Sequence, residues 1–317
     1  MEKLIPKNPE VSVVIPVYNE QNNLAELHRQ LKIVLETKLK VKYEIIFIDD
    51  GSKDSSWNII VDLYSQNNNV KGIKLSRNFG HQQALKAGLD YSIGKAVISM
   101  DSDLQHPPEI IEKFYEEWKK GYDIVCATRK DTKGISLLKK VSSRFFYTFM
   151  NFLSDTKIEE GSSDFRLLDR KVVDEVKKFS ESHLFLRGII SWIGYKSTAV
   201  EYLASQRYSG KSKYTIKKMV HFALDGIMSF SIRPLRLAIA WGLLISIFSF
   251  LYILYALISK FVLKTTLLGW TSILISVLFL GGIQLLSIGI LGEYLGKLFI
   301  ESKKRKNYII DKFYPLV

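Results

Sequence analysis

Short motifs that mark many cofactor and zinc enzymes are missing from this sequence, and cysteine is almost missing. Neither G-x-G-x-x-G nor G-x-x-x-x-G-K-[ST] occurs in the region of alternating strand and helix patterns, which argues against a dinucleotide dehydrogenase and a P-loop enzyme. The five histidines show no H-x-H or H-E-x-x-H spacing, so we expect structural roles rather than zinc binding. The single cysteine, Cys126, excludes an internal disulfide and is expected to be a small buried residue.

A signal sequence and an acidic excess are also lacking. Residues 1–10 are polar and contain proline, without the apolar stretch of a secretory signal, so we expect no signal peptide. The formal charge is +13, from 45 basic and 32 acidic residues, which suits nucleic acid, anionic lipid or a phosphorylated substrate. No RRM, zinc-finger or helix-turn-helix signature accompanies this charge, so nucleic acid is not an expected partner.

Charge disappears altogether from two stretches, residues 237–259 and 269–291. Each would form about 35 Å of helix at about 1.5 Å per residue, and a bilayer core is about 30 Å thick. Only residues 260–268 separate the two stretches. The sequence therefore predicts two membrane spans joined as a hairpin.

Basic residues flank this predicted hairpin on both outer sides. They cluster at 211–236 before the first span and at 297–306 after the second, whereas the connecting loop holds only Lys260 and Lys264. Because positive charge concentrates on the cytoplasmic side of a membrane protein, we expect both ends of the hairpin, and the large N-terminal domain, in the cytoplasm.

The predicted division has three parts. Residues 1–213 form a cytoplasmic α/β domain, residues 214–235 an amphipathic region, and residues 236–317 the hairpin with a basic cytoplasmic tail. Apolar residues recur at helical spacing in 214–230, which fits either a helix in the membrane interface or an ordinary helix on the soluble domain. Residues 136–153 are a second candidate of the same kind.

Short β-rich runs alternate with longer helical patterns in the first half of the chain. The predicted strands are 11–15, 44–48, 70–75, 96–100 and 124–128, and the predicted helices are 23–35, 55–64, 82–91 and 108–119. This alternation predicts the α/β class, with a Rossmann-like, mostly parallel sheet covered by helices on both faces.

Polar clusters follow all five predicted strands. They begin at Pro16, Asp49, Ser76, Asp101 and Arg129 in turn. Open α/β sheets bind ligands beyond the carboxyl ends of their strands, so five such clusters in register predict one ligand-binding crevice.

Asp101 and Asp103 supply two carboxylates at alternate positions, and in extended backbone such side chains point the same way. Two carboxylates, an amide oxygen from Gln105 and phosphate oxygens suit a hard divalent ion, Mg²⁺ or Mn²⁺. The alternative is a pair of helix-capping and turn aspartates before Pro107.

Four motifs together resemble the family 2 glycosyltransferases with a GT-A fold. They are V-V-I-P-V-Y-N-E at 13–20, I-D-D-G-S at 48–52, D-S-D at 101–103 and S-D-F-R at 163–166. Residues 76–82, 101–108 and 207–214 resemble more closely the polyprenyl-phosphate glycosyltransferases, the group of dolichol-phosphate mannose synthase. The C-terminal hairpin is similar to that of the bacterial bactoprenol glucosyltransferases, and the resemblance covers nearly the whole chain.

This resemblance implies roles for individual residues. Metal and donor diphosphate would be held by Asp101, Asp103 and Gln105. The donor nucleotide would contact Pro16, Tyr18, Glu20, Asp49, Asp50, Arg77, Gly80, Ser102 and Lys213, the last on a mobile loop. The acceptor phosphate would be clamped by Arg129, Arg144 and Arg207, and the catalytic residues would be Asp164, Arg129 and Arg207.

Asp164 matches a carboxylate that resembles a general base in relatives acting on sugar hydroxyls. A lipid phosphate is already ionised near neutral pH, and base catalysis matters when the pKa of the acceptor lies far above the working pH. We therefore expect Asp164 to orient the acceptor or the sugar, with base catalysis secondary.

The resemblance implies an inverting transfer of glucose from UDP-glucose to undecaprenyl phosphate at the inner (plasma) membrane of a bacterium. GDP-mannose, UDP-N-acetylglucosamine and a modified UDP-arabinose stay open as donors. A processive polysaccharide synthase would carry a Q-x-x-R-W motif and more spans, and neither is found. A catalytically silent membrane scaffold is the rival from another class. Glycines in the second span, at 281, 282, 289 and 292, favour a homo-oligomer.

Overall fold

The computed structural model describes residues 8–130, 162–181, 184–203, 233–262 and 269–314. Within them an eight-stranded sheet has the order β7-β5-β6-β4-β1-β2-β3-β8. The strands are β1 (Val11–Val17), β2 (Tyr43–Asp49), β3 (Val70–Leu75), β4 (Ala96–Ser99), β5 (Ile124–Lys130), β6 (Ser162–Asp169), β7 (Ser197–Leu203) and β8 (Ile310–Tyr314). The sheet is mostly parallel around β1, as predicted, and the five strands predicted from the sequence are confirmed.

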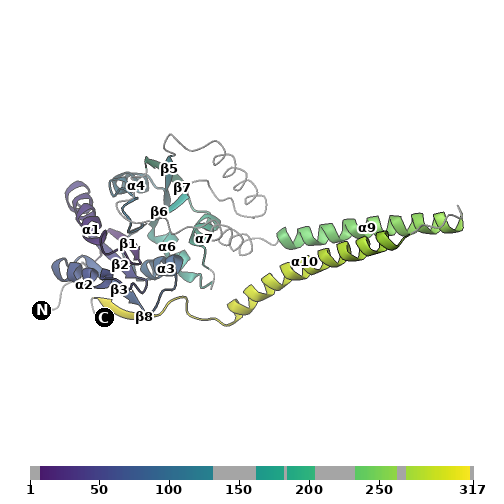
Figure 1. The fold of residues 1–317 in the computed structure, drawn as a ribbon. Coiled ribbons are helices and arrows are strands. Elements are labelled where there is room, and N and C mark those ends of the chain that lie inside the picture. The colour runs from purple at the N-terminus through teal and green to yellow at the C-terminus, as the bar shows by residue number, and fades with distance from the viewer. Residues whose placement is uncertain (1–7, 131–161, 182–183, 204–232, 263–268, 315–317) are drawn as a thin grey trace.

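Helices cover both faces of this sheet (Figure 1). One face packs against α1 (Leu24–Lys32), its π-helical continuation η1 (Ile33–Lys38), α2 (Ser56–Gln66) and α4 (Ile110–Lys119). The other packs against α3 (His81–Tyr91), α6 (Arg170–Lys178) and α7 (Leu186–Ile193).

Alternation of side chains along the central strands builds these two cores. In β2, Ile45 and Phe47 point into the first core, whereas Ile46 and Ile48 point into the second, and all four are fully buried. Successive side chains in a strand point to opposite faces, so a strand covered on both faces is apolar throughout. Cys126, half-buried in β5, packs at the edge of the second core and is less buried than expected.

Strand β6 is inserted between β4 and β5 and runs antiparallel to both. Its register places Arg166 opposite Ser99 of β4 and Cys126 of β5. Strands β6 and β7 were not among the predicted strands. The insertion brings Asp164, near the start of β6, to the sheet edge where Asp101 follows the end of β4.

Helix α3 approaches the sheet unusually closely. A Cβ added at Gly88 would lie 2.1 Å from Cγ1 of Val14 and 2.6 Å from Cδ1 of Ile48. Only glycine allows this approach, since ordinary carbon contacts are about 3.5–4.0 Å. Helix α3 therefore packs directly on β1 and β2 through its last turn.

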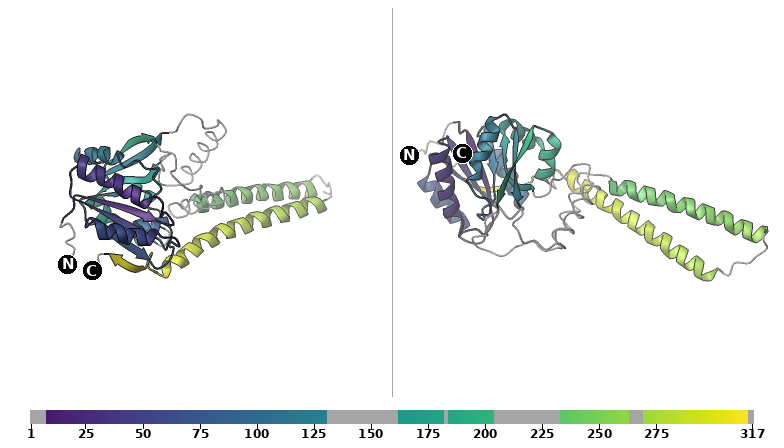
Figure 2. Two further views of the ribbon diagram at one scale, coloured as in Figure 1. Left: turned by 60° about the vertical axis from the view of Figure 1, so that its left-hand side comes forward. Right: turned by 90° about the horizontal axis from the view of Figure 1, so that it is seen from above.

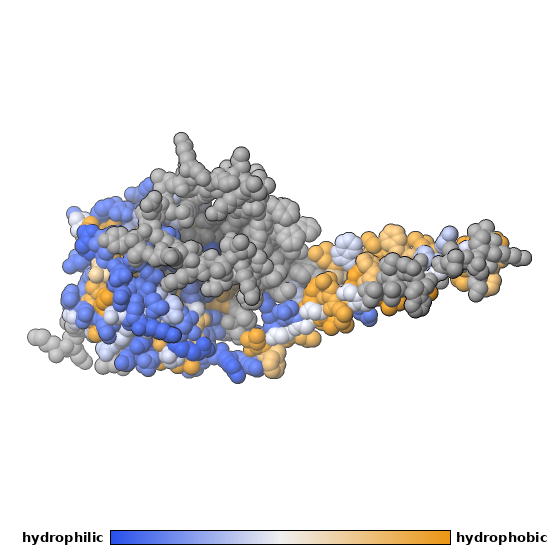
Figure 3. Space-filling model, in the orientation of Figure 1, coloured by the Kyte–Doolittle hydropathy of each residue, from blue (hydrophilic) through white to orange (hydrophobic). Residues whose placement is uncertain are grey.

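The two predicted spans are long helices that project from the domain side by side (Figures 1 and 2). Helix α9 covers Arg233–Phe261 and helix α10 covers Trp270–Ser302. Their apolar side chains are exposed, and Leu235–Ser259 and Phe279–Ser302 are long and apolar enough to cross a membrane (Figure 3). Helix α10 continues past the predicted end at residue 291.

The chain returns from α10 to the sheet. Strand β8 pairs antiparallel with β3, with Gly72 opposite Tyr314 and Ile73 opposite Phe313 (Figure 2). The phenol of Tyr308 donates to Oδ2 of Asp90 at 2.8 Å. Residues 310–314, which the sequence assigned to a basic tail, therefore complete the α/β domain, and the C-terminal end of the hairpin leads into that domain.

Candidate active site

The loops after β1 and β2 are joined by reciprocal hydrogen bonds. The backbone N–H of Asn19 donates to Oγ of Ser52 at 3.0 Å, and Oδ1 of Asn19 accepts from the N–H of Lys53 at 2.8 Å. The N–H of Glu20 donates to Oγ of Ser56 at 2.9 Å. Pro16 is buried within β1, whereas Tyr18 and Glu20 are half-buried in this double loop. These hydrogen bonds hold the loop that carries the predicted donor-binding residues of the first motif against residues 52–56.

Asp49 ends β2 and Asp50 follows it, and both carboxylates accept hydrogen bonds from backbone N–H groups. Asp50 accepts from the N–H of Phe79 at 2.7 Å and from that of Gly80 at 3.0 Å. Asp49, which is fully buried, accepts from the N–H of Ser52 at 3.2 Å. Burial raises the pKa of both carboxyls. Both side chains shape loops in this structure, and their contact with a nucleotide stays a prediction.

Gly51 lets the loops after β2 and β3 meet. It has a φ of +69°, and a Cβ there would lie 2.7 Å from the backbone of Arg77 and Asn78. In the second loop the Arg77 guanidinium lies 4.2 Å from the ring centre of Phe79. Gly80, with a φ of +100°, precedes the first residue of α3. Arg77 and Gly80 therefore lie at the same sheet edge as Asp101.

The predicted metal residues occupy the loop after β4. The N–H of Asp101 donates to Nδ1 of His106 at 3.1 Å, and the His106 ring stacks on Phe165 at 4.9 Å. Asp103 accepts from the N–H of Gln105 at 3.1 Å. The Asp101 side chain is 37% exposed, whereas Ser102 is buried.

The predicted metal residues in this loop carry side-chain oxygens, and a substrate would complete the coordination of a divalent ion. Among the described residues, no group of three or more His, Cys, Asp or Glu side chains is arranged to hold a metal. The oxygens of Asp101, Asp103 and Gln105 fit Mg²⁺ or Mn²⁺, which commonly complete their coordination with water and substrate phosphates. The donor set therefore fits a metal that arrives with a nucleotide diphosphate.

Asp164 lies at the centre of a charged cluster that the sequence did not predict. Its Oδ1 accepts from Nε of Arg187 at 2.8 Å and from Nη2 of Arg166 at 3.3 Å. Its Oδ2 accepts from Nη2 of Arg187 at 3.0 Å and from Nε2 of Gln82 at 3.2 Å. Burial opposes ionisation, but the Arg187 charge and the surrounding donors outweigh it and hold the pKa of Asp164 well below its usual range.

His81 stands between Asp164 and the metal loop. Its Nε2 lies 3.5 Å from Oδ2 of Asp164 and 3.5 Å from Oδ1 of Asp101. Loss of hydration disfavours its charged form, but the bond to Asp164 and the charge of Asp101 prevail and raise the pKa of His81 to about 9. The His81 imidazole therefore lies within ion-pair distance of both Asp164 and the predicted metal carboxylate Asp101.

The amino-acid sequence indicated only part of this charged cluster. His81, Gln82 and Arg166 fall within sequence motifs of the predicted family; His81 was expected to be structural, and no role was predicted for Gln82 and Arg166. Arg187 had one available signal, a lone charge in the otherwise apolar helix α7.

The predicted acceptor residues are described in part. Arg129 lies at the carboxyl end of β5, opposite Tyr202 of β7 and at the same sheet edge as Asp101. Arg144, Arg207 and Lys213 lie outside the described residues, as do the candidate amphipathic helices at 136–153 and 214–230.

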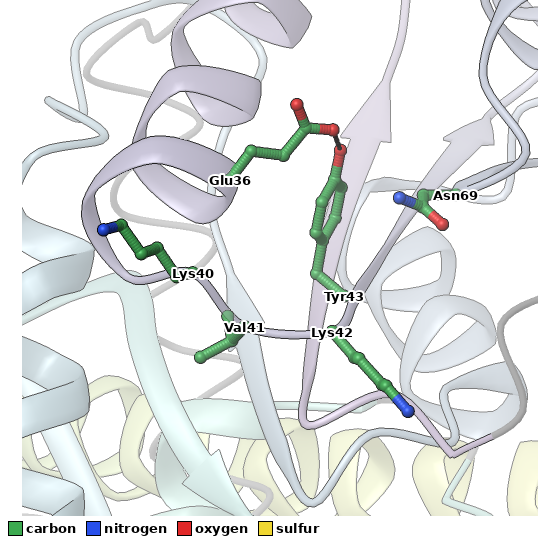
Figure 4. A pocket seen from close by; sticks show the side chains of 6 residues that line it. All are labelled: Glu36, Lys40, Val41, Lys42, Tyr43 and Asn69. Carbon is green, nitrogen blue, oxygen red and sulfur yellow. Dashed lines mark hydrogen bonds between the residues drawn. The ribbon is translucent and has the colours of Figure 1, made fainter.

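A separate pocket of about 370 Å³ lies at the opposite edge of the sheet (Figure 4). It is lined by Glu36, Lys40, Val41, Lys42, Tyr43 and Asn69. Tyr43 begins β2 and donates to Glu36 at 2.6 Å, so this pocket lies at the amino ends of the strands. It is remote from the cluster around Asp101 and Asp164.

Known proteins resemble the chain along almost its whole length. A bactoprenol glucosyl transferase of Shigella phage SfV is 43% identical over 300 residues, covering 95% of this chain and 97% of that protein. An uncharacterised glycosyltransferase of Bacillus subtilis is 43% identical over 305 residues, covering 96% and 94%. The structure of S. aureus TarS 1-349 with UDP-GlcNAc has a TM-score of 0.48 and 17% identity, covering 69% of this chain and 66% of that one.

The model of the family named glycosyl transferase family 2 matches residues 12–177, which include β1 to β6 and the carboxylates Asp101, Asp103 and Asp164. The predicted family and its mostly parallel sheet with two apolar C-terminal helices are confirmed. The chain is a glycosyltransferase and belongs to glycosyl transferase family 2.

Proposed function

We propose that this glycosyltransferase moves glucose from UDP-glucose to a polyprenyl phosphate, such as undecaprenyl phosphate. The observation that carries the proposal is the 43% identity to a bactoprenol glucosyl transferase over 95% of the chain, hairpin included. The site supports it chemically, since acidic residues for a metal–diphosphate stand beside a basic cluster.

The reaction is a single displacement with inversion. An oxygen of the acceptor phosphate attacks the anomeric carbon of the sugar, the bond from that carbon to the donor diphosphate breaks, and the nucleoside diphosphate leaves. Asp101, Asp103 and Gln105 would hold Mg²⁺ or Mn²⁺, which supplies charge neutralisation for the leaving diphosphate. The protein contributes mainly positioning and electrostatic stabilisation.

No protein base is required for this displacement. A phosphate monoester carries an ionised oxygen near neutral pH, and Asp164 already accepts four hydrogen bonds from cationic and amide donors. A carboxylate whose pKa is held low is a poor proton acceptor. Asp164 is therefore assigned to orientation rather than proton transfer.

The acceptor phosphate would be bound by Arg129, Arg144 and Arg207, with Lys213 closing over the donor. The hairpin supports this assignment, because the headgroup of a polyprenyl phosphate lies at the membrane surface and α9 and α10 tether the domain there. We place the protein in the inner membrane of a bacterium, with residues 1–213 in the cytoplasm. The return of the chain from α10 into β8 supports this placement, because it keeps the C-terminal end of the hairpin with the α/β domain.

The test incubates the full chain in membranes with undecaprenyl phosphate, Mn²⁺ or Mg²⁺, and each labelled nucleotide sugar. Glucosyl-phospho-lipid formed from UDP-glucose supports the proposal. If transfer occurred only from GDP-mannose, UDP-N-acetylglucosamine or a UDP-arabinose derivative, that compound would be the donor in place of UDP-glucose. A homo-oligomer built through the glycine-bearing face of α10 is a separate part of the proposal, tested by cross-linking in membranes.

A further inference from the structure

Asp164 joins three elements that are separate in the sequence. It belongs to β6, and its carboxylate accepts from Gln82 in the first turn of α3 and from Arg187 in the first turn of α7. Gln82 also accepts, through Oε1, from the N–H of Leu186 at 3.2 Å. The first turns of α3 and α7 are thus tied to each other and to one buried carboxylate.

Arg187 makes the shortest hydrogen bonds in this junction. Its two bonds to Asp164, at 2.8 and 3.0 Å, have the bidentate geometry in which a guanidinium fixes both oxygens of a carboxylate. Asp164 is 6% exposed and therefore shielded from water, whereas the Arg187 side chain is 33% exposed and the pair is partly screened. Rotation of the carboxylate would break bonds to Arg187, Arg166 and Gln82 together.

The orientation of Asp164 in turn sets the position of His81. Nε2 of His81 lies at the same 3.5 Å distance from Asp164 and from the predicted metal ligand Asp101. His81 is the first residue of α3, and α3 is held to the sheet by the close approach at Gly88. A shift of Asp164 therefore moves the imidazole relative to the carboxylate that would hold the metal.

We propose that Arg187 is a positioning residue for sugar transfer. It fixes the Asp164 carboxylate in one orientation, and through it places His81 and the first turn of α3 beside the donor diphosphate. The inference rests on the proposed function for its reaction and assigns Arg187 no direct contact with substrate.

The test is a double-mutant cycle on kcat, using whichever nucleotide sugar the wild-type chain transfers to undecaprenyl phosphate. Arg187→Gln is expected to lower kcat by roughly 10- to 100-fold, because misplacing a catalytic group by about 1 Å costs up to about 10²-fold. In an Asp164→Asn background the same substitution is expected to cost less than about 3-fold, because coupled residues are non-additive. Arg187→Lys should recover part of kcat, since lysine keeps the positive charge but cannot make the bidentate contact of a guanidinium.

Arg170→Gln is the matched control. Arg170 is a half-buried arginine whose Nε donates to the carbonyl of Gly94 at 2.8 Å, at the opposite edge of the sheet. Its loss is expected to lower the thermal midpoint and leave kcat per folded enzyme unchanged. Binding of UDP with Mn²⁺ by each variant, measured by calorimetry, gives the folded fraction and should stay within about 3-fold of wild type.

An equal cost of Arg187→Gln in both backgrounds would overturn the proposal and assign Arg187 a direct contact with substrate. An unchanged kcat in Arg187→Gln would overturn it as well. If Arg170→Gln lowered kcat by as much as Arg187→Gln, the Arg187–Asp164 pair would only stabilise the fold, and the proposal would be overturned. Failure of the proposed function is recognised separately, by a wild-type chain that binds UDP but transfers no sugar.

Discussion

At the residue scale, the site contains two carboxylates, Asp101 and Asp164, that lie in different environments. Asp101 is 37% exposed and available for a metal, whereas Asp164 is buried and saturated by donors. The sequence motifs gave the two residues different expected roles, and the fold adds that Asp101 is partly exposed while Asp164 is surrounded by hydrogen-bond donors. That distinction depends on Arg187, which is 23 positions from Asp164 and belongs to no recognised motif.

Asp164→Asn should keep measurable turnover. The substitution leaves a shape that can still accept from Arg187, while removal of a true general base usually costs about 10²- to 10⁴-fold. Single-turnover rates with pre-bound donor measure the chemical step directly. Turnover lost completely, with donor binding intact, would restore Asp164 as the base.

Acid stability should depend on the same residue. The pKa of Asp164 is lower in the folded chain than the ordinary value of about 3.9, so its stabilising contribution is complete above about pH 4 and is lost as pH falls through the folded pKa. Thermal unfolding of the detergent-solubilised protein between pH 3 and pH 6 measures this slope. Asp164→Asn should flatten it, and an unchanged slope would mean that other carboxyls cause the acid sensitivity.

At the element scale, the central parallel strands were predictable and the strands that complete the sheet were not. The former are continuous apolar runs bounded by polar turns, as in β2. Strand β6 carries Asp164 and Arg166 within it, and β8 has exposed Asp311 and Lys312, so neither shows that pattern. Their places depend on partners distant in sequence, β4 and β3, which local periodicity does not report.

Gly88→Ala tests how closely α3 must approach the sheet. The new Cβ would meet Val14 and Ile48 well inside contact distance, so we expect about 1–3 kcal/mol of destabilisation from overpacking and a reduced kcat as α3 moves. Asn58→Ala, at an exposed position on α2, is the control and should change neither. Normal stability and activity in Gly88→Ala would show that α3 can shift freely.

Strand β8 should be required for an intact site. It extends the edge of β3, and the carbonyl of Ile309 accepts from the N–H of Ser76, the residue that begins the Arg77 loop. Its Phe313 ring lies 5.2 Å from Tyr91, and its Tyr314 ring 5.8 Å from Trp57.

Phe313→Ser should therefore release the strand, expose the β3 edge to limited proteolysis and lower the affinity for UDP. Lys312→Ala, at an exposed position of the same strand, should do neither. An intact digestion pattern in Phe313→Ser would show that β8 pairing does not depend on that side chain.

At the scale of the whole molecule, the chain leaves the α/β domain into α9 and returns from α10 into β8. The sheet is therefore joined to the C-terminal end of the hairpin through β8. Hydropathy and charge predicted the hairpin, while its return to the sheet became visible only in the structure.

The most direct measurement of the central claim is the lipid product formed by the full chain with UDP-glucose, undecaprenyl phosphate and Mn²⁺. The account predicts a glucosyl-phospho-lipid of inverted anomeric configuration, lost on Asp103→Ala and on chelation of the metal. Transfer that is indifferent to Asp103→Ala, or the absence of any sugar-phospho-lipid with every nucleotide sugar, would contradict it.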